Sequence, residues 1–313
     1  MTQARPVLPT DLLALVSYNG RSYKNEAWTR ERLGADESGN TLGLVLDQFL
    51  AFARARSAWI SVRRQRLQGL VGARRRGGRQ AWEIDYLIDA TPGRDAVLGL
   101  LECAISEAGN SGAEKLFLRL DSGSELLTVA RRAGFMPYQE ELLYAKQQGT
   151  GNKEQEPSAL RRVEPSDSYA LYRLYNATTP EVTRRSEAAT FAEWHAAQER
   201  RWMKQGLQLL AETDGRISAT VRGAKLPQGV LAELTLADAD CDAEGVVNAL
   251  AQALGAEATR SFVLVPSTSE GLANQLQDAG YTPHQEFVSM VRRTARTLKL
   301  PKLLPAIAKS VSA

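Results

Sequence analysis

The sequence predicts a mixed α/β fold that occurs twice, as two tandem domains whose mixed sheets carry helices on both faces. Two internal repeats lead to this prediction. Residues 133–140 read AGFMPYQE and residues 279–286 read AGYTPHQE, and RPVLPTDLLAL (5–15) resembles RRVEPSDSYAL (161–171). The two offsets are nearly equal and far exceed the roughly 20–50 residues of a solenoid unit. The repeat is therefore a whole fold.

In the first half, we expect two helices and three antiparallel strands, followed by helix, strand, helix and strand. Pro9-Thr10-Asp11 is a helix start, since Thr or Asp caps free N–H groups. TLGLVLDQFLAFARA (41–55) has apolar residues at helical spacing. Gly77-Gly78 lies between two alternating runs and predicts a hairpin. The expected strands are 57–64, 66–76, 80–89, 114–120 and 138–146, and the later helices are 95–108 and 124–134.

The second half repeats this order. A helix begins at Pro165-Ser166-Asp167, a long helix is expected over 186–204, and Asp214-Gly215 predicts a tight hairpin. The expected strands are 206–213, 216–223, 230–237, 261–266 and 286–293, and the later helices are 242–254 and 270–280. Strands and helices in this order predict one mixed sheet in each half.

The polar stretch QQGTGNKEQEPS (147–158) lacks apolar periodicity and is interpreted as a linker. It separates a first domain at 1–146 from a second at 159–294. A basic tail follows at 295–313. Its leucines could pack on the second domain or lie on an acidic membrane surface, and Pro301 and Pro305 favour packing or disorder.

Composition excludes several classes of protein. No run of 18 apolar residues occurs, so no transmembrane segment is expected, and the N-terminus lacks the apolar core of a secretory signal. The chain has two cysteines and two histidines, which argues against a disulfide framework and against a metal site. We therefore expect a cytoplasmic protein without a metal.

The element order, the opening R-x-V-x-P-[ST]-D and the AG-aromatic signature near each end resemble the GNAT N-acyltransferase superfamily over nearly the whole chain. The resemblance implies acetyl-CoA in a cleft where the fourth and fifth strands part. Its pyrophosphate would rest on the loop and helix N-terminus that follow the fourth strand. In the first half these positions are Leu87, Ile88, Gly93, Arg94, Asp95 and Ala96.

The sequence departs from the family pattern at both phosphate loops. DATPGRDAVLG keeps Gly93 and Arg94, but its glycines are out of register. ADADCDAEGVV in the second half has four acidic residues, which would repel a pyrophosphate. The first half is therefore predicted to be the cofactor-binding one, and the second domain to be degenerate.

The resemblance also implies a carboxylate base on the fourth strand, where Glu83 and Glu233 stand. The alternation of the strand favours a structural interpretation, in which Glu83 and Asp85 are solvent-facing residues of a half-buried strand. The tyrosine acid of many family members is replaced by Ala130 and Leu276. Tyr144 on the last strand of the first half is a candidate replacement.

These features leave two main functions open. One is acyl-CoA-dependent transfer of an acetyl group to the amine of a small molecule or peptide. The other is a non-catalytic tandem module that binds a ligand or partner. Nine arginines between Arg54 and Arg79 could bind an anionic partner or protect a hairpin edge. The net charge of only +3 makes a dedicated nucleic-acid binder an unfavoured third option.

Overall fold

The computed structural model describes residues 4–8, 11, 24–34, 57–63, 66–90, 95–147, 160–200, 202–226, 229–237, 241–255 and 260–294. The predicted helix at 41–55, the helix expected after Asp11, the loop 91–94, nearly all of the linker and the tail lie outside the described residues. None of the described helices has the length and apolar character needed to span a bilayer.

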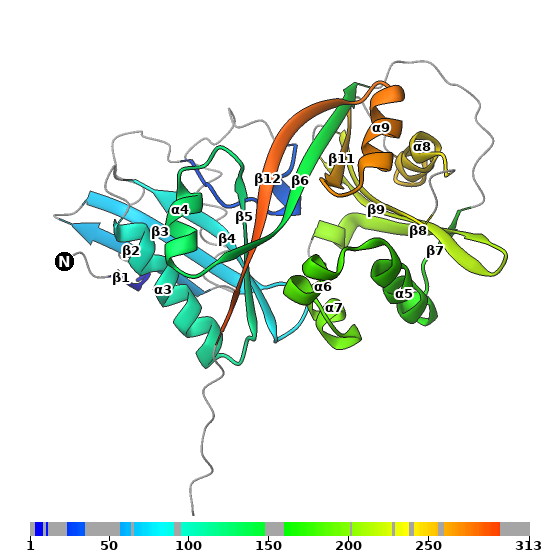
Figure 1. Ribbon diagram of the computed structural model, residues 1–313. Coiled ribbons are helices and arrows are strands. Elements are labelled where there is room, and N and C mark those ends of the chain that lie inside the picture. Colours follow the sequence, from blue (N-terminus) through cyan, green and yellow to red (C-terminus); the bar gives the residue numbers. More distant parts are fainter. Residues whose placement is uncertain are drawn as a thin grey trace, which may run out of the picture.

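Twelve strands form one sheet (Figure 1). They are β1 (Ala4–Pro6), β2 (Ser57–Arg63), β3 (Arg66–Arg75), β4 (Ala81–Asp89), β5 (Lys115–Asp121), β6 (Met136–Gln147), β7 (Arg161–Arg162), β8 (Gly206–Thr213), β9 (Arg216–Leu226), β10 (Gly229–Leu236), β11 (Arg260–Pro266) and β12 (Thr282–Arg293). Their order is β1-β2-β3-β4-β5-β12-β6-β11-β10-β9-β8-β7, which reads the same way inward from both ends. In each half the fourth and fifth strands are parallel, and the other neighbours are antiparallel.

The last strand of each half lies against the sheet of the other half. β12 pairs antiparallel with β5, β6 pairs antiparallel with β11, and the two long strands also pair with each other, as Figure 1 shows. The repeated sequences at 133–140 and 279–286 therefore occupy equivalent positions at the starts of β6 and β12. The domain limits at 146 and 159 stay a prediction, since β6, which comes before this boundary in the chain, pairs with β11 of the second half.

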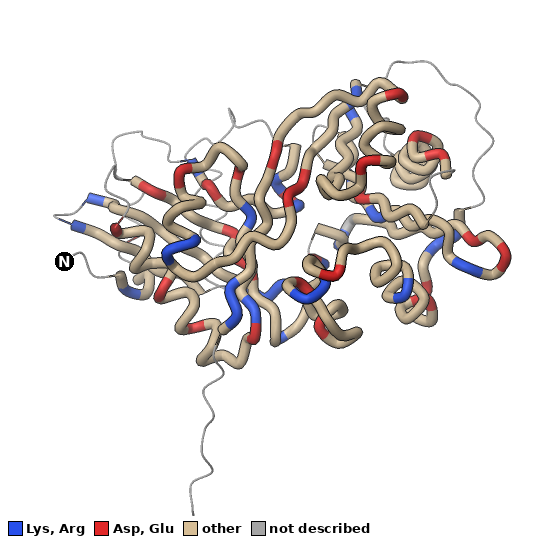
Figure 2. The backbone as a smooth tube through the Cα atoms, in the orientation of Figure 1, with Lys and Arg blue, Asp and Glu red and all other residues tan. Residues whose placement is uncertain are grey.

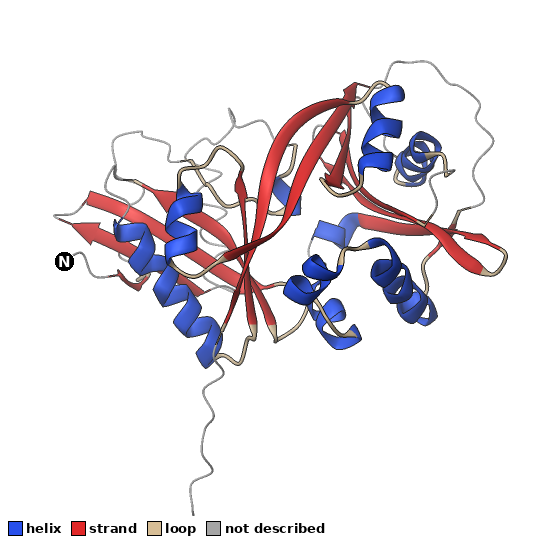
Figure 3. Cartoon of the chain, in the orientation of Figure 1, coloured by secondary structure: helices blue, strands red, loops and turns tan. Residues whose placement is uncertain are grey.

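Helices cover both faces of the sheet (Figure 3). They are α3 (Asp95–Asn110), α4 (Leu126–Arg132), α5 (Ser168–Thr178), α6 (Glu181–Glu187), α7 (Phe191–Ala197), α8 (Ala243–Ala253) and α9 (Glu270–Asp278). Side chains of β5 alternate between the faces, as strand geometry requires. Leu116 and Leu118 join the core beneath α3 and α4, whereas Phe117 packs with Ala196 of α7 on the other side.

The predicted long helix at 186–204 is wrong. The chain forms α6 and α7 with a break between them, because Ala188 is extended (φ −160°, ψ 100°) and Thr190 begins a new helix by accepting a hydrogen bond from the Glu193 N–H. After α7 the chain turns through a 3₁₀ helix, Trp202–Gln205. The break lets residues 196–199 approach the first half.

The two predicted hairpins are confirmed. Asp214 and Gly215 both have positive φ, 52° and 71°, which suits the two-residue turn that joins β8 and β9. The Gly77 turn between β3 and β4 lies against the end of α7, where the Gly77 N–H donates to the Ala196 carbonyl. A Cβ at Gly77 would lie 2.5 Å from the Gln198 carbonyl oxygen, so only glycine permits this contact between the halves.

Candidate functional site

The parallel pair of strands in each half separates part-way along its length. Residues 81–83 of β4 pair with 115–117 of β5, and residues 230–233 of β10 pair with 261–264 of β11. Beyond these residues the described parts of the two strands no longer pair. These two gaps are where the sequence predicts a cofactor cleft, and the structure fills them differently.

In the first half, the segment 24–34 occupies the gap. The Asn25 side-chain amide donates to the Asp85 carbonyl (3.0 Å), and its oxygen accepts the Leu87 N–H (2.8 Å). The Glu26 N–H donates to the Leu87 carbonyl (2.8 Å), and the Trp28 N–H donates to Arg119 of β5 (2.9 Å). The segment thus bonds to both separated strands and uses the backbone groups that a cofactor arm would need. This counts against the predicted cofactor site beside Leu87.

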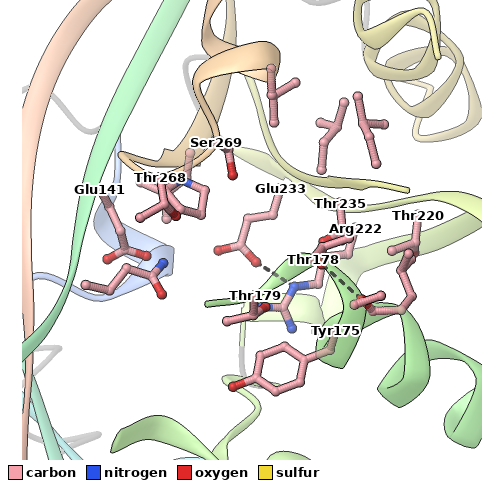
Figure 4. A pocket seen from close by; sticks show the side chains of 18 of the residues that line it. Glu141, Tyr175, Thr178, Thr179, Thr220, Arg222, Glu233, Thr235, Thr268 and Ser269 are labelled. Atoms are coloured by element: carbon pink, nitrogen blue, oxygen red, sulfur yellow. Dashed lines mark hydrogen bonds and ion pairs between the residues drawn. The ribbon is translucent and has the colours of Figure 1, made fainter. Parts of the chain in front are cut away.

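In the second half, the corresponding gap opens into a cavity of about 570 Å³. Its walls come from the ends of β10 and β11, the N-terminus of α9, and helices α5, α6 and α7 (Figure 4). Many of the lining side chains carry neutral hydroxyl or amide groups: Thr178, Thr179, Thr220, Thr235, Thr268, Ser269, Gln139, Gln198, Gln208 and Gln275. Such a lining suits a ligand rich in amides and hydroxyls.

The end of β10 presents its backbone to this cavity. Thr235 lies opposite Thr220 of β9, and the Ala237 N–H donates to the Ser218 carbonyl, which fixes the hydrogen-bonding register with β9. In an antiparallel ladder alternate residues bond to the partner strand, so the N–H and C=O groups of Leu234 and Leu236 point the other way, toward β11. Both residues line the cavity.

Glu233 stands at the floor of the cavity, at the fourth-strand position predicted for a carboxylate. Its side chain pairs with Arg222 (2.5 Å, dashed in Figure 4) and with Arg30. Burial by itself would raise the pKa of Glu233, but the charges of Arg222 and Arg30 lower it overall. The group is therefore an ionised carboxylate at neutral pH and a weak proton acceptor.

Glu233 belongs to a continuous set of ion pairs that joins the two halves, the central ion-pair network. Its members are Arg30, Arg74, Arg76, Arg119, Arg222, Glu31, Glu83, Asp85, Glu141, Glu199 and Glu233. Glu199, which follows α7, connects Arg30, Arg76 and Arg119. Two residues of the arginine-rich region, Arg74 and Arg76, are thus buried and paired. Figure 2 shows both signs of charge in both halves.

Glu83 lies inside this network and not on the cavity. It is 5 % exposed, pairs with Arg74 (2.6 Å), and approaches Arg76 (3.7 Å). Burial and the nearby charge of Glu199 raise its pKa from 4.5 to about 7, against the opposing effect of the arginines. Among the described lining residues of the 570 Å³ cavity, Glu83 does not occur. The structure thus gives it no contact with a substrate there.

We expect Glu83→Gln to change how stability depends on pH. Folded wild type keeps a proton on Glu83 up to about pH 7, whereas the unfolded chain releases it near 4.5. The stability that this group contributes is therefore full at low pH and is lost as the pH rises through 7. The glutamine side chain does not titrate in this range. In urea unfolding between about pH 5 and about pH 8, the free energy of unfolding of the variant should therefore rise relative to that of wild type as the pH rises. A constant difference would contradict the assignment.

The other predicted site residues are dispersed. Tyr144 is buried beneath α9, where it accepts a hydrogen bond from the Gln277 amide (3.2 Å), and it does not line the described cavity. Ile88 is buried in a separate cluster with Ile60 and Leu70. Asp95 is exposed at the start of α3 and Ala96 follows it half-buried. Gly93 and Arg94 lie outside the described residues, and the role of this loop stays a prediction.

The N-terminus of α8, which follows the cavity strand β10, already holds a carboxylate. Asp242 caps the helix by accepting the Gly245 N–H (3.0 Å), and Glu244 in the first turn pairs with Lys146. These acidic groups satisfy the helix end and oppose a pyrophosphate there, as the sequence predicts. Within the described residues, no group of three His, Cys, Asp or Glu side chains could hold a metal.

Sequence reasoning missed three parts of this site. The segment 24–34 has no periodicity that predicts its insertion between strands. Glu199 and Arg30 look like ordinary surface charges in the sequence, and only the tertiary contacts bury them. The pair Arg222 and Glu233 was detectable in principle, because it repeats the pair Arg74 and Glu83 at equivalent positions on neighbouring strands.

Comparisons with known proteins agree on the fold. No protein-family model matches the sequence, and no curated protein matches it. The structure resembles a GCN5-related N-acetyltransferase from Sphaerobacter thermophilus, with 16 % identity, a TM-score of 0.53, and coverage of 95 % of this chain and 97 % of the other. A protein from Pyrococcus horikoshii gives 12 % identity and a TM-score of 0.51, covering 94 % and 89 %. A tandem GNAT protein from the clavulanic acid biosynthesis pathway gives 12 % identity and a TM-score of 0.49, with coverage of 95 % of this chain and 100 % of the other.

The predicted fold is therefore confirmed: the chain has the tandem GNAT fold. The two-fold order of its sheet and the whole-length similarity to a GCN5-related N-acetyltransferase agree on this point. At such low identity the likeness defines the fold alone, and function has to be argued from the cavity.

Proposed function

We propose that the protein transfers an acyl group, such as acetyl, from an acyl-CoA to an amine, and that both substrates meet in the second-half cavity. One observation carries the proposal: the parted ends of β10 and β11 open directly into this cavity, whereas the equivalent gap of the first half is filled by residues 24–34. The proposal thus places the cofactor in the half opposite to the one predicted from the loop sequences.

The cavity offers partners to the amide-rich arm of an acyl-CoA. Backbone groups of Leu234 and Leu236 point toward it, and the hydroxyls of Thr235 and Thr268 lie nearby (Figure 4). The arm would add to the edge of β10 as an extra strand does, through main-chain hydrogen bonds. Helices α5 to α7 close the far side and would hold the acceptor.

The reaction would be direct attack of the amine nitrogen on the thioester carbonyl. The C–N bond forms, the C–S bond breaks, and the proton lost by the nitrogen passes to the departing thiolate, so that coenzyme A leaves as its thiol. Glu233 is the fourth-strand carboxylate that reaches the cavity. Because arginines lower its pKa, we assign it an electrostatic role: it stabilises the positive charge that develops on the attacking nitrogen.

One observation favours the alternative, a non-catalytic binding module. The Asp242 cap and Glu244 occupy the helix end where a pyrophosphate would bind. A protein that keeps the cavity without this anchor could bind a smaller ligand and perform no transfer. Direct binding measurements separate the two functions.

We expect Ala237→Trp to weaken acetyl-CoA binding by at least about tenfold. Ala237 is exposed at the end of β10 and lines the cavity, so an indole there fills the mouth without disturbing the core. Calorimetric titration with acetyl-CoA should show binding to wild type and a loss of at least about tenfold in the variant. Ala253→Trp, on an exposed position of α8 away from the cavity, is the matched control and should bind as wild type does.

Thiol release measured across a panel of amines then tests transfer. Turnover that Ala237→Trp removes and Ala253→Trp keeps supports the proposal. Binding without turnover on any amine supports the non-catalytic module. Equal acetyl-CoA affinity in wild type and Ala237→Trp would exclude the second-half cavity as the cofactor site.

A further inference from the structure

One corner of the cavity combines a carboxylate with aromatic rings. Glu187, at the end of α6, lines the cavity together with Tyr138 of β6, Tyr175 of α5 and Trp194 of α7. The rings of Tyr175 and Trp194 are 6.3 Å apart between centroids, and the Tyr175 hydroxyl donates to Glu187 Oε2 at 3.4 Å. Three helices and the exchanged strand β6 therefore bring these four side chains together.

Glu187 differs from the other carboxylates deep in the cavity. Glu141 pairs with Arg119, and Glu233 pairs with Arg30 and Arg222. In the part of the chain that the structure describes, no salt bridge involves Glu187. The cations near Glu187 have other partners. Arg184 bonds to Asn176 and to the Thr179 carbonyl. Lys115 donates to the Glu187 backbone carbonyl (2.8 Å) and pairs with Glu193, and Arg76, whose pKa the charge of Glu187 helps to raise, pairs with Glu199.

The hydrogen bond from the Tyr175 hydroxyl places the Glu187 carboxylate beside this aromatic group. Burial, followed by the charge of Glu187, raises the pKa of both Tyr138 and Tyr175. A half-buried carboxylate beside aromatic faces is a favourable site for an ammonium group, since the ring faces and the carboxylate both attract positive charge. The carboxylate would repel an anionic group, and a neutral donor would bind it less strongly than an ammonium group does.

We propose that this corner binds an ammonium group of the acyl acceptor other than the nitrogen that is acylated, so that the acceptor is at least a diamine. A nitrogen held by a carboxylate and aromatic rings keeps its proton, and a protonated nitrogen has no lone pair for attack on a thioester. The acylated amine must then lie further in, toward Glu233 and β10. Describing the ligand as an acyl acceptor rests on the proposed transferase function. The binding of an ammonium group beside Glu187 does not depend on that function.

Binding of simple amines tests the site without any acyl-CoA. Diaminobutane and butylamine are titrated into wild type by calorimetry, and we expect the diamine to bind more tightly. Glu187→Gln removes the charge and keeps an oxygen that can accept the Tyr175 hydroxyl. It should weaken diamine binding by about tenfold or more. Glu270→Gln is the charge-matched control, since Glu270 lines the same cavity from the start of α9, and it should leave the affinity within about twofold.

Tyr175→Phe distinguishes recognition from a structural role. If Glu187 only held Tyr175 in place, Tyr175→Phe and Glu187→Gln would weaken the diamine equally, and the inference would be overturned. We expect Tyr175→Phe to keep most of the affinity, because it retains the ring. Equal diamine binding in wild type and Glu187→Gln, or an equal loss in Glu270→Gln, would also overturn it.

The outcomes separate this inference from the proposed function. If the protein binds a diamine in a way that depends on Glu187 but binds no acetyl-CoA, the result supports the ammonium site and contradicts the transferase function. If butylamine and diaminobutane are acetylated at equal rates, the result supports the transferase function and contradicts the ammonium site.

Discussion

Glu199→Gln should lower the free energy of unfolding by about 3–5 kcal/mol, because it leaves buried guanidinium groups without their shared counter-charge. Glu199 is 5 % exposed and pairs with Arg30, Arg76 and Arg119. Burial would raise its pKa, but the three arginines hold it well below its usual range, so the carboxylate is ionised in the folded protein.

The matched control is Glu181→Gln. Glu181 forms an exposed pair with Arg185 one helical turn away, and such pairs contribute about 0.5 kcal/mol or less. Urea unfolding of wild type and both variants at neutral pH gives the comparison. If Glu199→Gln cost no more than Glu181→Gln, the central ion-pair network would not stabilise the contact between the halves.

The order of elements was predictable because each signal is local. Alternating runs, hairpin glycines and helix caps depend on a few neighbouring residues, and the Asp214-Gly215 turn is where the pattern places it. The failure at 186–204 is local as well. Apolar spacing continues through Ala188 and Ala189, so only the capping role of Thr190 reveals the break.

The strand exchange was not predictable, and the repeat itself is the reason. β6 and β12 descend from equivalent sequences, AGFMPYQE and AGYTPHQE, so either strand has the pattern needed to lie beside β5 or β11. Pairing between them is set by contacts more than a hundred residues apart, such as the hydrogen bond that the Ser289 hydroxyl of β12 donates to Glu141 of β6. No local signal can distinguish a strand of one half from its counterpart.

The cofactor cleft that the sequence predicts in the first half stays a prediction, and the proposed function places this cleft in the second half instead. Loop composition alone favoured the first half, because acidic residues follow β10. The structure adds a stronger steric consideration: a filled gap cannot hold a ligand, whatever charge its loop carries. Whether the filling segment is tightly bound thus decides which cleft is available, and Asn25 is the residue that tests it.

Asn25→Ala should destabilise the protein by roughly 2–4 kcal/mol, since buried backbone groups left without partners cost about 1–3 kcal/mol each and part of that cost is relieved by relaxation. The amide of Asn25 is 4 % exposed and satisfies three backbone groups: the Asp85 carbonyl and the N–H groups of Leu87 and Ala27. Alanine supplies none of these bonds. Water has little room to replace them, because Leu87 and Ala27 are fully buried.

Asn176→Ala provides the comparison, because Asn176 is half-buried and makes one side-chain bond, to Arg184, so its loss should cost about 1 kcal/mol or less. Hydrogen exchange gives a local reading of the same event. The Leu87 amide should be protected in wild type and in Asn176→Ala, and should exchange much faster in Asn25→Ala, because its acceptor is gone. Unchanged protection of Leu87 would mean that residues 24–34 are not what satisfies β4. The first-half gap would then return as a candidate for the cofactor, in competition with the cavity beside β10.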